Sequence, residues 1–272
     1  MFSPAARAAL KAALNEDVGP GDKTSNFLVP SSAWGSAVLV ARESGIFCGG
    51  PVIRELLRVT DRRLACGFFV SDGKPFRKSK ILARIQGPVR GILKAERTLL
   101  NLLGRLSGIA TLTREYVRRV SRYGTRILDT RKTTPLWREL EKYAVRTGGG
   151  KNHRMGLYDE IFVKENHKAH GRLGRLSKIP RRFFMEVRNL RELKEALVLK
   201  PRVILFDNFP PARLKGVLKL ARRSDPRILL EASGGIHLGN VARYARLGLD
   251  QISIGRLTHS PKSMDFSLLI EK

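Results

Sequence analysis

The second half of the chain alternates short apolar runs with longer amphipathic stretches. The runs are rich in Val, Ile, Leu and Phe, which is typical of buried parallel strands, and the stretches between them have helical spacing. Six strands that alternate with helices predict an α/β fold, namely an open or incomplete barrel of the triosephosphate isomerase kind. The expected strands are residues 126–128, 161–164, 183–187, 203–206, 228–231 and 251–254, with helices at 190–199, 211–221 and 240–247.

The first half of the chain has a different pattern. Several short strands and two short helices predict an α+β layer, with antiparallel strands and helices on one side. Residues 94–120 then carry a long apolar stripe, in which Ser107 and Gly108 predict a kink between two helices. The expected helices are 4–14 and 52–59, and the expected strands are 34–42, 64–70, 80–86 and 89–93.

Composition limits the classes of protein that this chain can represent. It has 272 residues and is 42% hydrophobic, so it can bury a core and is not disordered throughout. It lacks a signal peptide and any run of about 18 to 20 apolar residues, so we expect a cytoplasmic protein without a membrane partner. Two cysteines provide neither a disulfide framework nor the ligand spacing of a zinc site.

The charge of the chain is its strongest compositional signal. Lys and Arg number 52 against 24 Asp and Glu, which gives a formal charge of +28 and a pI near 11.1. Such basicity is typical of a nucleic-acid-binding protein, or of a surface that is basic for other reasons. Aromatic residues make up only 7%, and the basic residues are spread along the chain. We therefore expect no nucleic-acid partner, and we interpret most of the excess charge as a general property of the surface.

The carboxyl ends of the expected barrel strands carry the candidate chemistry, because active sites of such barrels form there. Ser233, Gly234 and Gly235 follow the fifth strand, and Gly255 follows the sixth. Backbone N–H groups beside a helix N-terminus can bind a phosphate in such glycine loops. The alternative is a pair of tight turns in which glycine supplies a positive φ. Two such loops at this place favour the phosphate site.

Another glycine-rich segment lies earlier in the chain. Residues 148–150 are glycines, and Lys151, His153 and Arg154 follow them. A flexible loop is the simpler interpretation of this segment alone. With Arg131 and Lys132 nearby in barrel order, a cationic cluster becomes the second candidate for binding an anion.

Two acids stand at neighbouring strand ends in a chain that has few acids. Glu186 lies on the third expected strand, and Asp207 follows the fourth. Two carboxylates that face a phosphate-rich ligand can hold Mg²⁺, so we expect this cofactor and these ligands. The alternative, slightly favoured by spacing alone, is that both acids pair with neighbouring Arg or Lys. The residues together predict a highly anionic ligand with at least one phosphate.

These segments also resemble a known family. The motif Asp129-Thr-Arg-Lys-Thr-Thr-Pro135 is similar to one in quinolinate phosphoribosyltransferase. The same similarity is found in segments 96–101, 107–111, 140–145, 148–157, 164–167, 207–208, 231–235 and 258–260. The similarity extends over essentially the whole chain. It implies an enzyme of NAD biosynthesis that converts quinolinate and phosphoribosyl pyrophosphate into nicotinate mononucleotide, pyrophosphate and CO₂.

The resemblance also implies an architecture. Residues 1–105 correspond to an N-terminal α/β sandwich domain, which the C-terminal tail 260–272 joins, and residues 106–259 correspond to the open α/β barrel. The residue that matches Arg97 enters the active site from the neighbouring subunit in the family. The resemblance therefore implies a homodimer with a shared active site, or a higher oligomer.

Residue roles follow from the same resemblance, position by position. The cationic residues match contacts to the two substrates, the acids match groups near the ribose and Mg²⁺, and the glycines match the 5′-phosphate site. Lys132, Glu186 and Asp207 are the residues expected to act in catalysis. The quinolinate pocket comprises Arg97, Arg131, His153 and Arg154, the donor contacts Lys132 and Lys164, and the phosphate site Ser233, Gly234, Gly235, Gly255 and His259.

The chain departs from the family pattern in two regions, one of which is Leu136-Trp137, where a small residue is more usual. The segment between Lys164 and Glu186 is shorter than usual where a crossover helix is expected, and Phe184 stands where a second glutamate is usual.

Two other functions remain open at this point. One is a related phosphoribosyltransferase with a different substrate, and the other is a basic nucleic-acid-binding protein built on the same scaffold.

Overall fold

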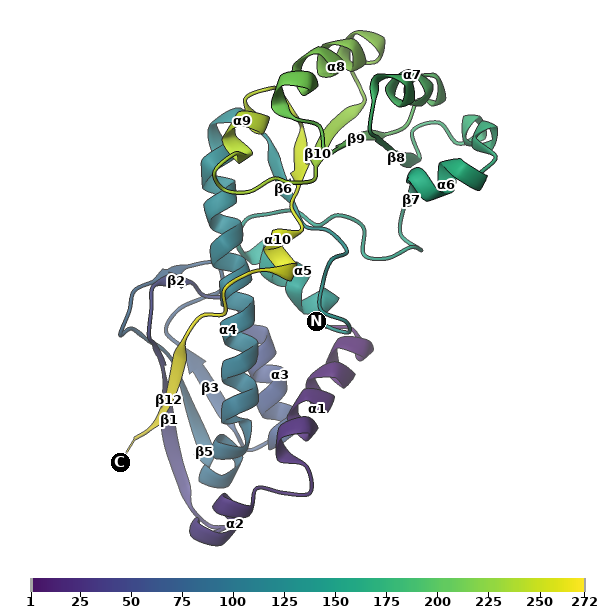
Figure 1. The fold of residues 1–272 in the computed structure, drawn as a ribbon. Coiled ribbons are helices and arrows are strands. Elements are labelled where there is room, and N and C mark those ends of the chain that lie inside the picture. Colours follow the sequence, from purple (N-terminus) through teal and green to yellow (C-terminus); the bar gives the residue numbers. More distant parts are fainter. Residues whose placement is uncertain (1, 272) are drawn as a thin grey trace. The chain divides into compact units, whose positions relative to one another are not determined.

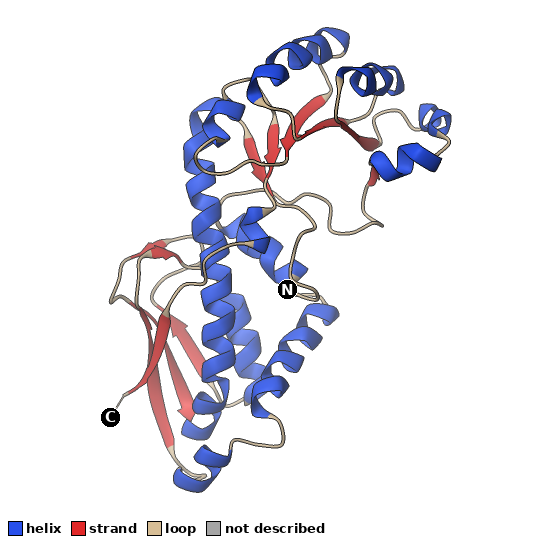
Figure 2. Ribbon diagram, viewed as in Figure 1, coloured by secondary structure: helices blue, strands red, loops and turns tan. Residues whose placement is uncertain are grey.

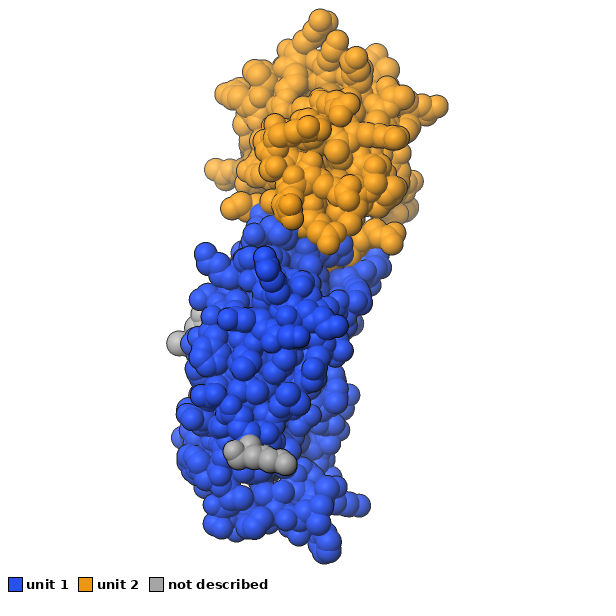
Figure 3. Space-filling model, turned by 90° about the vertical axis from the view of Figure 1, so that its left-hand side faces the viewer, with its two compact units in different colours: residues 1–114, 133–149, 258–272 blue, residues 115–132, 150–257 orange. Residues whose placement is uncertain are grey.

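The computed structural model describes residues 2–271, which form two compact units (Figure 3). The first unit contains residues up to Arg114, together with Thr133–Gly149 and Thr258–Lys272. The second unit contains Glu115–Lys132 and Gly150–Leu257. Helix α4 (Val89–Val120) runs without a break through residue 105, so the domain boundary expected there stays a prediction.

An antiparallel sheet of four strands organises the first unit, in the order β12–β1–β5–β3 (Figure 1). The C-terminal strand β12 pairs with β1, where Ala37 lies opposite Ile270, so the tail of the chain completes this sheet. A two-stranded sheet of β2 and β4 accompanies it. The strands are β1 (Trp34–Ala41), β2 (Gly45–Ile46), β3 (Ala65–Phe68), β4 (Pro75–Phe76), β5 (Ile81–Pro88) and β12 (Phe266–Ile270).

Helices gather on one side of this sheet, as the pattern of the first half predicts (Figure 2). Helix α1 (Pro4–Val18) begins at the Ser3 N-cap, whose hydroxyl accepts from the Ala6 N–H. It buries Ala6, Leu10 and Leu14, which recur every four residues and so form one apolar face. The other helices of this unit are α2 (Lys23–Leu28), α3 (Gly50–Thr60) and α5 (Arg138–Thr147).

Helix α4 corrects two expectations from the sequence. Residues 89–93 belong to this helix and not to a strand, and Ser107 and Gly108 do not break it. A Cβ atom at Gly108 would lie 2.0 Å from the carbonyl oxygen of Lys262, so glycine permits the C-terminal chain to pass against the helix. The Ser107 hydroxyl donates to the Cys48 carbonyl oxygen at 3.2 Å. Both residues thus serve close packing rather than a kink.

A parallel sheet of six strands organises the second unit, in the order β6–β11–β10–β9–β8–β7. The terminal strands β6 and β7 do not pair with each other in the described part of the chain, so the barrel is open, which confirms the expected α/β fold. The strands are β6 (Arg126–Leu128), β7 (Ile161–Val163), β8 (Phe183–Val187), β9 (Val203–Asp207), β10 (Leu229–Ser233) and β11 (Gln251–Ser253).

Short helices connect these strands. Between β7 and β8, where the sequence departs from the family pattern, the chain forms only the six-residue helix α6 (Glu165–His170) and the 3₁₀ helix η2 (Leu173–Lys178). None of the described helices combines the length and apolar character needed to cross a membrane. The remaining helices are η1 (Ser121–Tyr123), α7 (Leu190–Leu199), α8 (Pro211–Ser224), α9 (Val241–Ala245) and α10 (Arg256–His259).

Candidate active site

The carboxyl ends of β7, β8 and β9 bring three of the predicted residues together. Lys164 follows β7 directly, Glu186 lies near the end of β8, and Asp207 ends β9. The Lys164 Nζ atom donates to Glu186 Oε2 at 2.8 Å, which pairs a half-exposed amine with a buried carboxylate. This contact is a charge-assisted hydrogen bond.

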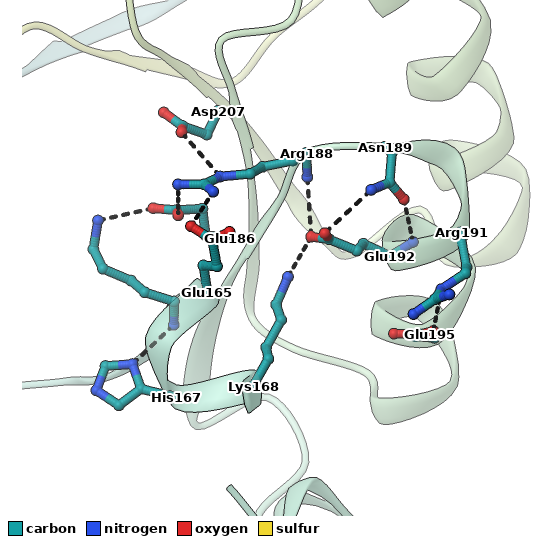
Figure 4. A network of polar contacts seen from close by, with 11 residues as sticks. Glu165, His167, Lys168, Glu186, Arg188, Asn189, Arg191, Glu192, Glu195 and Asp207 are labelled. Carbon is teal, nitrogen blue, oxygen red and sulfur yellow. Dashed lines mark hydrogen bonds and ion pairs between the residues drawn. The ribbon is translucent and has the colours of Figure 1, made fainter. Parts of the chain in front are cut away.

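Arg188 joins this group, although the sequence analysis did not select it. Its Nε lies 3.5 Å from Asp207 Oδ2, its Nη2 lies 3.8 Å from Glu186 Oε1, and its Nη1 contacts Glu165 (Figure 4). The signal was available, because residues 186 and 188 are separated by two at the end of a strand and so project toward the same face. The acids pair with neighbouring cations, as the alternative interpretation expected.

His153 occupies a more enclosed position in the segment between α5 and β7. Its backbone N–H donates to Asp129 Oδ1 at 2.9 Å, and its Nδ1 accepts from the Arg154 N–H at 2.8 Å. The imidazole stacks on Phe162, with ring centroids 5.5 Å apart. Because Nδ1 accepts a hydrogen bond, the ring proton lies on Nε2, which is 3.6 Å from Glu231 Oε1.

Glu231 is a second residue that the sequence analysis did not select as a site. It is fully buried on β10, accepts from Gln251 Nε2 at 2.6 Å and also accepts from the Ser253 hydroxyl. Burial raises the pKa of this carboxyl to about 7, because the charged form loses its hydration. In the motif of residues 231–235, the sequence selected Ser233, Gly234 and Gly235 but not Glu231.

Arg154 is the most buried of the predicted cations, at 8% exposure. Its Nη1 donates to the Glu160 carbonyl oxygen at 2.8 Å, and its guanidinium lies 5.0 Å from the Phe162 ring centroid. Burial, reinforced by the positive charge of Arg131, lowers the pKa of Arg154 from its usual value. A guanidinium held in this way is well placed to bind a carboxylate, because it is only weakly hydrated.

A cavity of about 420 Å³ lies beside His153 and Arg154. Phe184 and Leu128 supply apolar walls, whereas Arg202 supplies a further guanidinium. The cavity is also lined by the first residues of several strands, so it extends toward the amino ends of the sheet. The residues that line it do not include Lys164, Glu186 or Asp207, and it therefore unites only part of the predicted site.

The predicted phosphate loop after β10 adopts a conformation that requires glycine. Gly234 and Gly235 have φ values of 89° and 62°, and a Cβ atom on Gly234 would lie 2.2 Å from Asn208 Oδ1. The Ser233 carbonyl oxygen accepts from the Asn208 N–H at 2.8 Å, which fixes the loop against the end of β9. These contacts explain the glycines as a tight turn, and the phosphate role stays a prediction.

The remaining predicted residues lie in different parts of the structure. Arg131 and Lys132 are exposed on the loop after β6, where the Lys132 N–H donates to the Thr130 hydroxyl at 3.1 Å. Gly255 precedes α10 in the second unit. Arg97 and His259 are exposed residues of the first unit, and the His259 Nδ1 lies 2.6 Å from the Ser260 hydroxyl. Their predicted roles are not tested by this geometry.

Comparison with known proteins identifies the family. The model of the quinolinate phosphoribosyl transferase C-terminal domain matches residues 109–269, and that of the N-terminal domain matches residues 22–107. The chain belongs to the quinolinate phosphoribosyltransferase family. It is 41% identical to the probable nicotinate-nucleotide pyrophosphorylase (carboxylating) of Bacillus subtilis, a match that covers 93% of this chain and 89% of that protein.

Other relatives and solved structures agree with this family assignment. A mitochondrial quinolinate phosphoribosyltransferase (decarboxylating) of Nicotiana tabacum is 34% identical, over 96% of this chain and 81% of that protein. The nicotinate-nucleotide pyrophosphorylase structure from Francisella tularensis has a TM-score of 0.91 and 34% identity, covering 99% and 98% of the two chains. The structure from Ehrlichia chaffeensis also has a TM-score of 0.91, with 31% identity and 99% coverage of both chains.

The described residues do not form a resident metal site in this member of the family. Among residues 2–271, no group of three or more His, Cys, Asp or Glu side chains is placed to hold a metal ion. Glu186 and Asp207, the predicted Mg²⁺ ligands, instead face Lys164 and Arg188. Two carboxylates that already face two positively charged side chains do not fit a metal ion held by protein ligands alone.

Proposed function

We propose that this protein transfers the phosphoribosyl group of phosphoribosyl pyrophosphate to quinolinate with loss of CO₂, which gives nicotinate mononucleotide and pyrophosphate for NAD biosynthesis. Membership of the family is the first support for this activity. The single observation in the structure that supports it most is the group of Lys164, Glu186 and Asp207 at one edge of an open barrel. Barrels of this type carry their active sites at that edge.

The buried cations are proposed to bind quinolinate. Quinolinate has two carboxylates on a planar ring, and a guanidinium can bind a carboxylate through two parallel hydrogen bonds. Arg154 and His153 would contact the acceptor from the enclosed side, and Arg131 and Lys132 would approach from the exposed loop. Orienting the ring nitrogen toward the ribose is the main catalytic contribution, because a positioned reactant avoids most of the entropic cost of the reaction.

The acids are proposed to stabilise the reacting ribose. The bond from ribose C1 to the pyrophosphate oxygen breaks, the electron pair leaves with pyrophosphate, and C1 gains oxocarbenium character. The quinolinate nitrogen then forms the new bond to C1 with its lone pair. Carboxylates of Glu186 and Asp207 near the ribose would stabilise the positive charge, which is favourable in a fixed and partly buried site.

Decarboxylation follows from the charge of the product ring. The bonded ring nitrogen is positive, so its charge stabilises the electron pair that remains on C2 when the C2–carboxylate bond breaks and CO₂ leaves. A proton from water then replaces the carboxylate on C2. The role proposed for this chain is to hold the reacting carboxylate in place, and no covalent nucleophile is needed.

The assembly, location and metal requirement are also proposals. We propose a cytoplasmic homodimer in which Arg97 of each subunit completes the site of its neighbour, as the family resemblance implies. Mg²⁺ enters this proposal as part of the donor substrate, bound to the diphosphate oxygens, and no step above depends on a resident metal. Sedimentation of the purified protein at several concentrations would measure the oligomeric state.

A turnover assay tests the proposed activity. Purified protein, quinolinate, phosphoribosyl pyrophosphate and Mg²⁺ are expected to yield nicotinate mononucleotide and CO₂ in equal amounts, and nicotinate in place of quinolinate is expected to yield no product. The Arg131→Ala variant should lose most of the turnover. Product from nicotinate alone would indicate a related transferase, and salt-sensitive binding to random duplex DNA without turnover would indicate the nucleic-acid function.

A further inference from the structure

Arg188 lies among three carboxylates directly after strand β8. Its strongest contact is to Glu165 on helix α6, a carboxylate whose side chain is 60% exposed. Its contacts to Glu186 and Asp207 are longer, at 3.8 and 3.5 Å between nitrogen and oxygen. The guanidinium therefore extends across the pair of acids without a short hydrogen bond to either of them (Figure 4).

The backbone that carries Arg188 is fixed, whereas its side chain can exchange partners. The Arg188 N–H donates to Glu192 Oε2 at 3.1 Å, and Asn189 caps helix α7 by accepting from the Glu192 N–H at 2.9 Å. The side chain itself is 42% exposed. Exposed ion pairs such as Arg188 with Glu165 contribute little net stability, so an anionic ligand can replace Glu165 at low cost.

Binding of the donor creates a need for this exchange. In the proposed function, Glu186 and Asp207 lie near the ribose and stabilise its positive charge, and the Arg188 guanidinium partly occupies the space in front of both acids. Lys164 and Arg188 both contact this group of acids, so without Arg188 the carboxylates of Glu165, Glu186 and Asp207 would repel an anionic donor more strongly. The donor's diphosphate is the anion that can draw the guanidinium away from these acids.

We propose that Arg188 is a donor-binding residue of this site. Glu165 holds its guanidinium across Glu186 and Asp207 when the donor is absent, and an oxygen of the donor's diphosphate takes the guanidinium when the donor binds. This inference rests on the proposed function for the identity of the donor. It goes further because it assigns the diphosphate contact to Arg188 and proposes that Glu165 competes with the diphosphate for the Arg188 guanidinium.

Direct binding of phosphoribosyl pyrophosphate tests this assignment. Calorimetric titration with Mg²⁺ and without quinolinate measures the dissociation constant in the wild type and in Arg188→Ala, Arg188→Lys and Glu165→Gln. Loss of a charged hydrogen bond should weaken binding about 10- to 100-fold in Arg188→Ala, and the Lys variant should lie between it and the wild type. Glu165→Gln should bind the donor as tightly as the wild type or more tightly, because the competitor has lost its charge.

The expected effects of Arg188→Ala and Glu165→Gln on donor binding differ, which distinguishes a ligand-binding residue from a member of a structural ion pair. Arg191→Ala is the matched control, because Arg191 pairs with Glu195 on α7 and contacts none of the three acids (Figure 4). If Arg188→Ala and Glu165→Gln weaken donor binding by the same factor, or if Arg188→Ala binds normally, the proposal is wrong. Thermal unfolding verifies that each variant is folded, and Arg188→Gln replaces the Ala variant if that one is not.

Because the titration contains no quinolinate, it tests the role of Arg188 independently of the proposal that quinolinate is the acceptor. If donor binding depends on Arg188 as expected but quinolinate is not converted, only the acceptor in the proposed function is wrong. If quinolinate is converted but donor binding is indifferent to Arg188, only the present inference is wrong. A wild-type protein that binds no phosphoribosyl pyrophosphate would overturn both.

Discussion

Two parts of the candidate site hold charged groups in opposite ways. On one side, His153 and Glu231 are buried at 7% and 0% side-chain exposure, against Phe162 and the strands β10 and β11. On the other side, Lys164 and Arg188 are exposed at 46% and 42%. We call these the buried side and the exposed side. Buried groups keep one geometry because breaking a contact there is costly, whereas exposed groups can exchange partners.

This difference agrees with the chemistry proposed for each side. Quinolinate is rigid and planar, so a site of fixed guanidinium and imidazole groups can be complementary to it before it arrives. The phosphoribosyl donor is flexible and highly charged, and its charge is lost in part when pyrophosphate leaves. Cations that can move from carboxylates to phosphates and back are suited to binding such a substrate and releasing such a product.

The largest expected effect is the loss of Arg154 from the buried side. Arg154→Ala removes a buried guanidinium, and we expect kcat/KM for quinolinate to fall about 100-fold or more, because a desolvated charge pair is lost. Steady-state kinetics with each substrate varied in turn should show that KM for the donor changes much less. Arg154→Lys should not restore activity, because an ammonium group lacks the planar fork.

Arg202 offers a matched control for Arg154. Its guanidinium lies 4.8 Å from the Phe184 ring centroid and it lines the same cavity, but its side chain is 47% exposed. Arg202→Ala should reduce kcat/KM by less than about threefold, since an exposed ion pair contributes little. Equal losses in the two variants would show that burial does not distinguish the quinolinate contact from its surroundings.

The next effect concerns Glu231 and the pH dependence of stability. Its pKa is raised to about 7 in the folded protein by burial, above the usual value of 4.5 for a glutamate. The folded state therefore holds a proton that the unfolded state releases, so Glu231 makes the free energy of unfolding decrease as pH rises from about 4.5 to 7. The slope from this one group is at most about 1.4 kcal/mol per pH unit.

Glu231→Gln removes this titration while keeping an acceptor oxygen in place. Denaturant unfolding at several pH values should show that the variant gains stability relative to the wild type as pH rises through this window, and that the difference is constant above pH 7. Glu231→Ala, in contrast, leaves the Ser253 and Gln251 donors without their acceptor, and should lower the free energy of unfolding by about 2 to 4 kcal/mol. Parallel pH profiles for wild type and Glu231→Gln would contradict the burial of a titrating carboxyl.

The sequence predicted the periodic elements better than the contacts between them. The helix at 190–199 and the strand at 183–187 were predicted with the observed bounds, because apolar periodicity reports which face is buried. The break expected at Gly108 was wrong, since the reason for that glycine is the Lys262 carbonyl oxygen, which lies far away in the sequence. Long-range approaches of this kind leave no local signal.

The same limit applies to the site. Position at the strand ends selected Glu186 and Asp207, and motif similarity selected Lys164. The fold brings these three residues together. The sequence did not select Arg188 or Glu231, whose interest comes from their partners in space rather than from their neighbours in sequence. Strand alternation placed Arg188 on the face of Glu186, but only the structure shows that it reaches Glu165 and Asp207.

The smallest expected effect comes from the surface of helix α7, where Arg191 and Glu195 form a pair with 88% and 47% side-chain exposure. Their nitrogen and oxygen atoms are 3.2 Å apart, at the i and i+4 positions of the helix. The cation precedes the acid, which is the weaker order for such a pair, so Glu195→Gln should change the free energy of unfolding by less than about 0.5 kcal/mol. Denaturant unfolding at low and high salt measures this value. A loss above about 1 kcal/mol would show that an exposed ion pair can be strong, and solvent exposure would then not indicate which ion pairs can exchange partners.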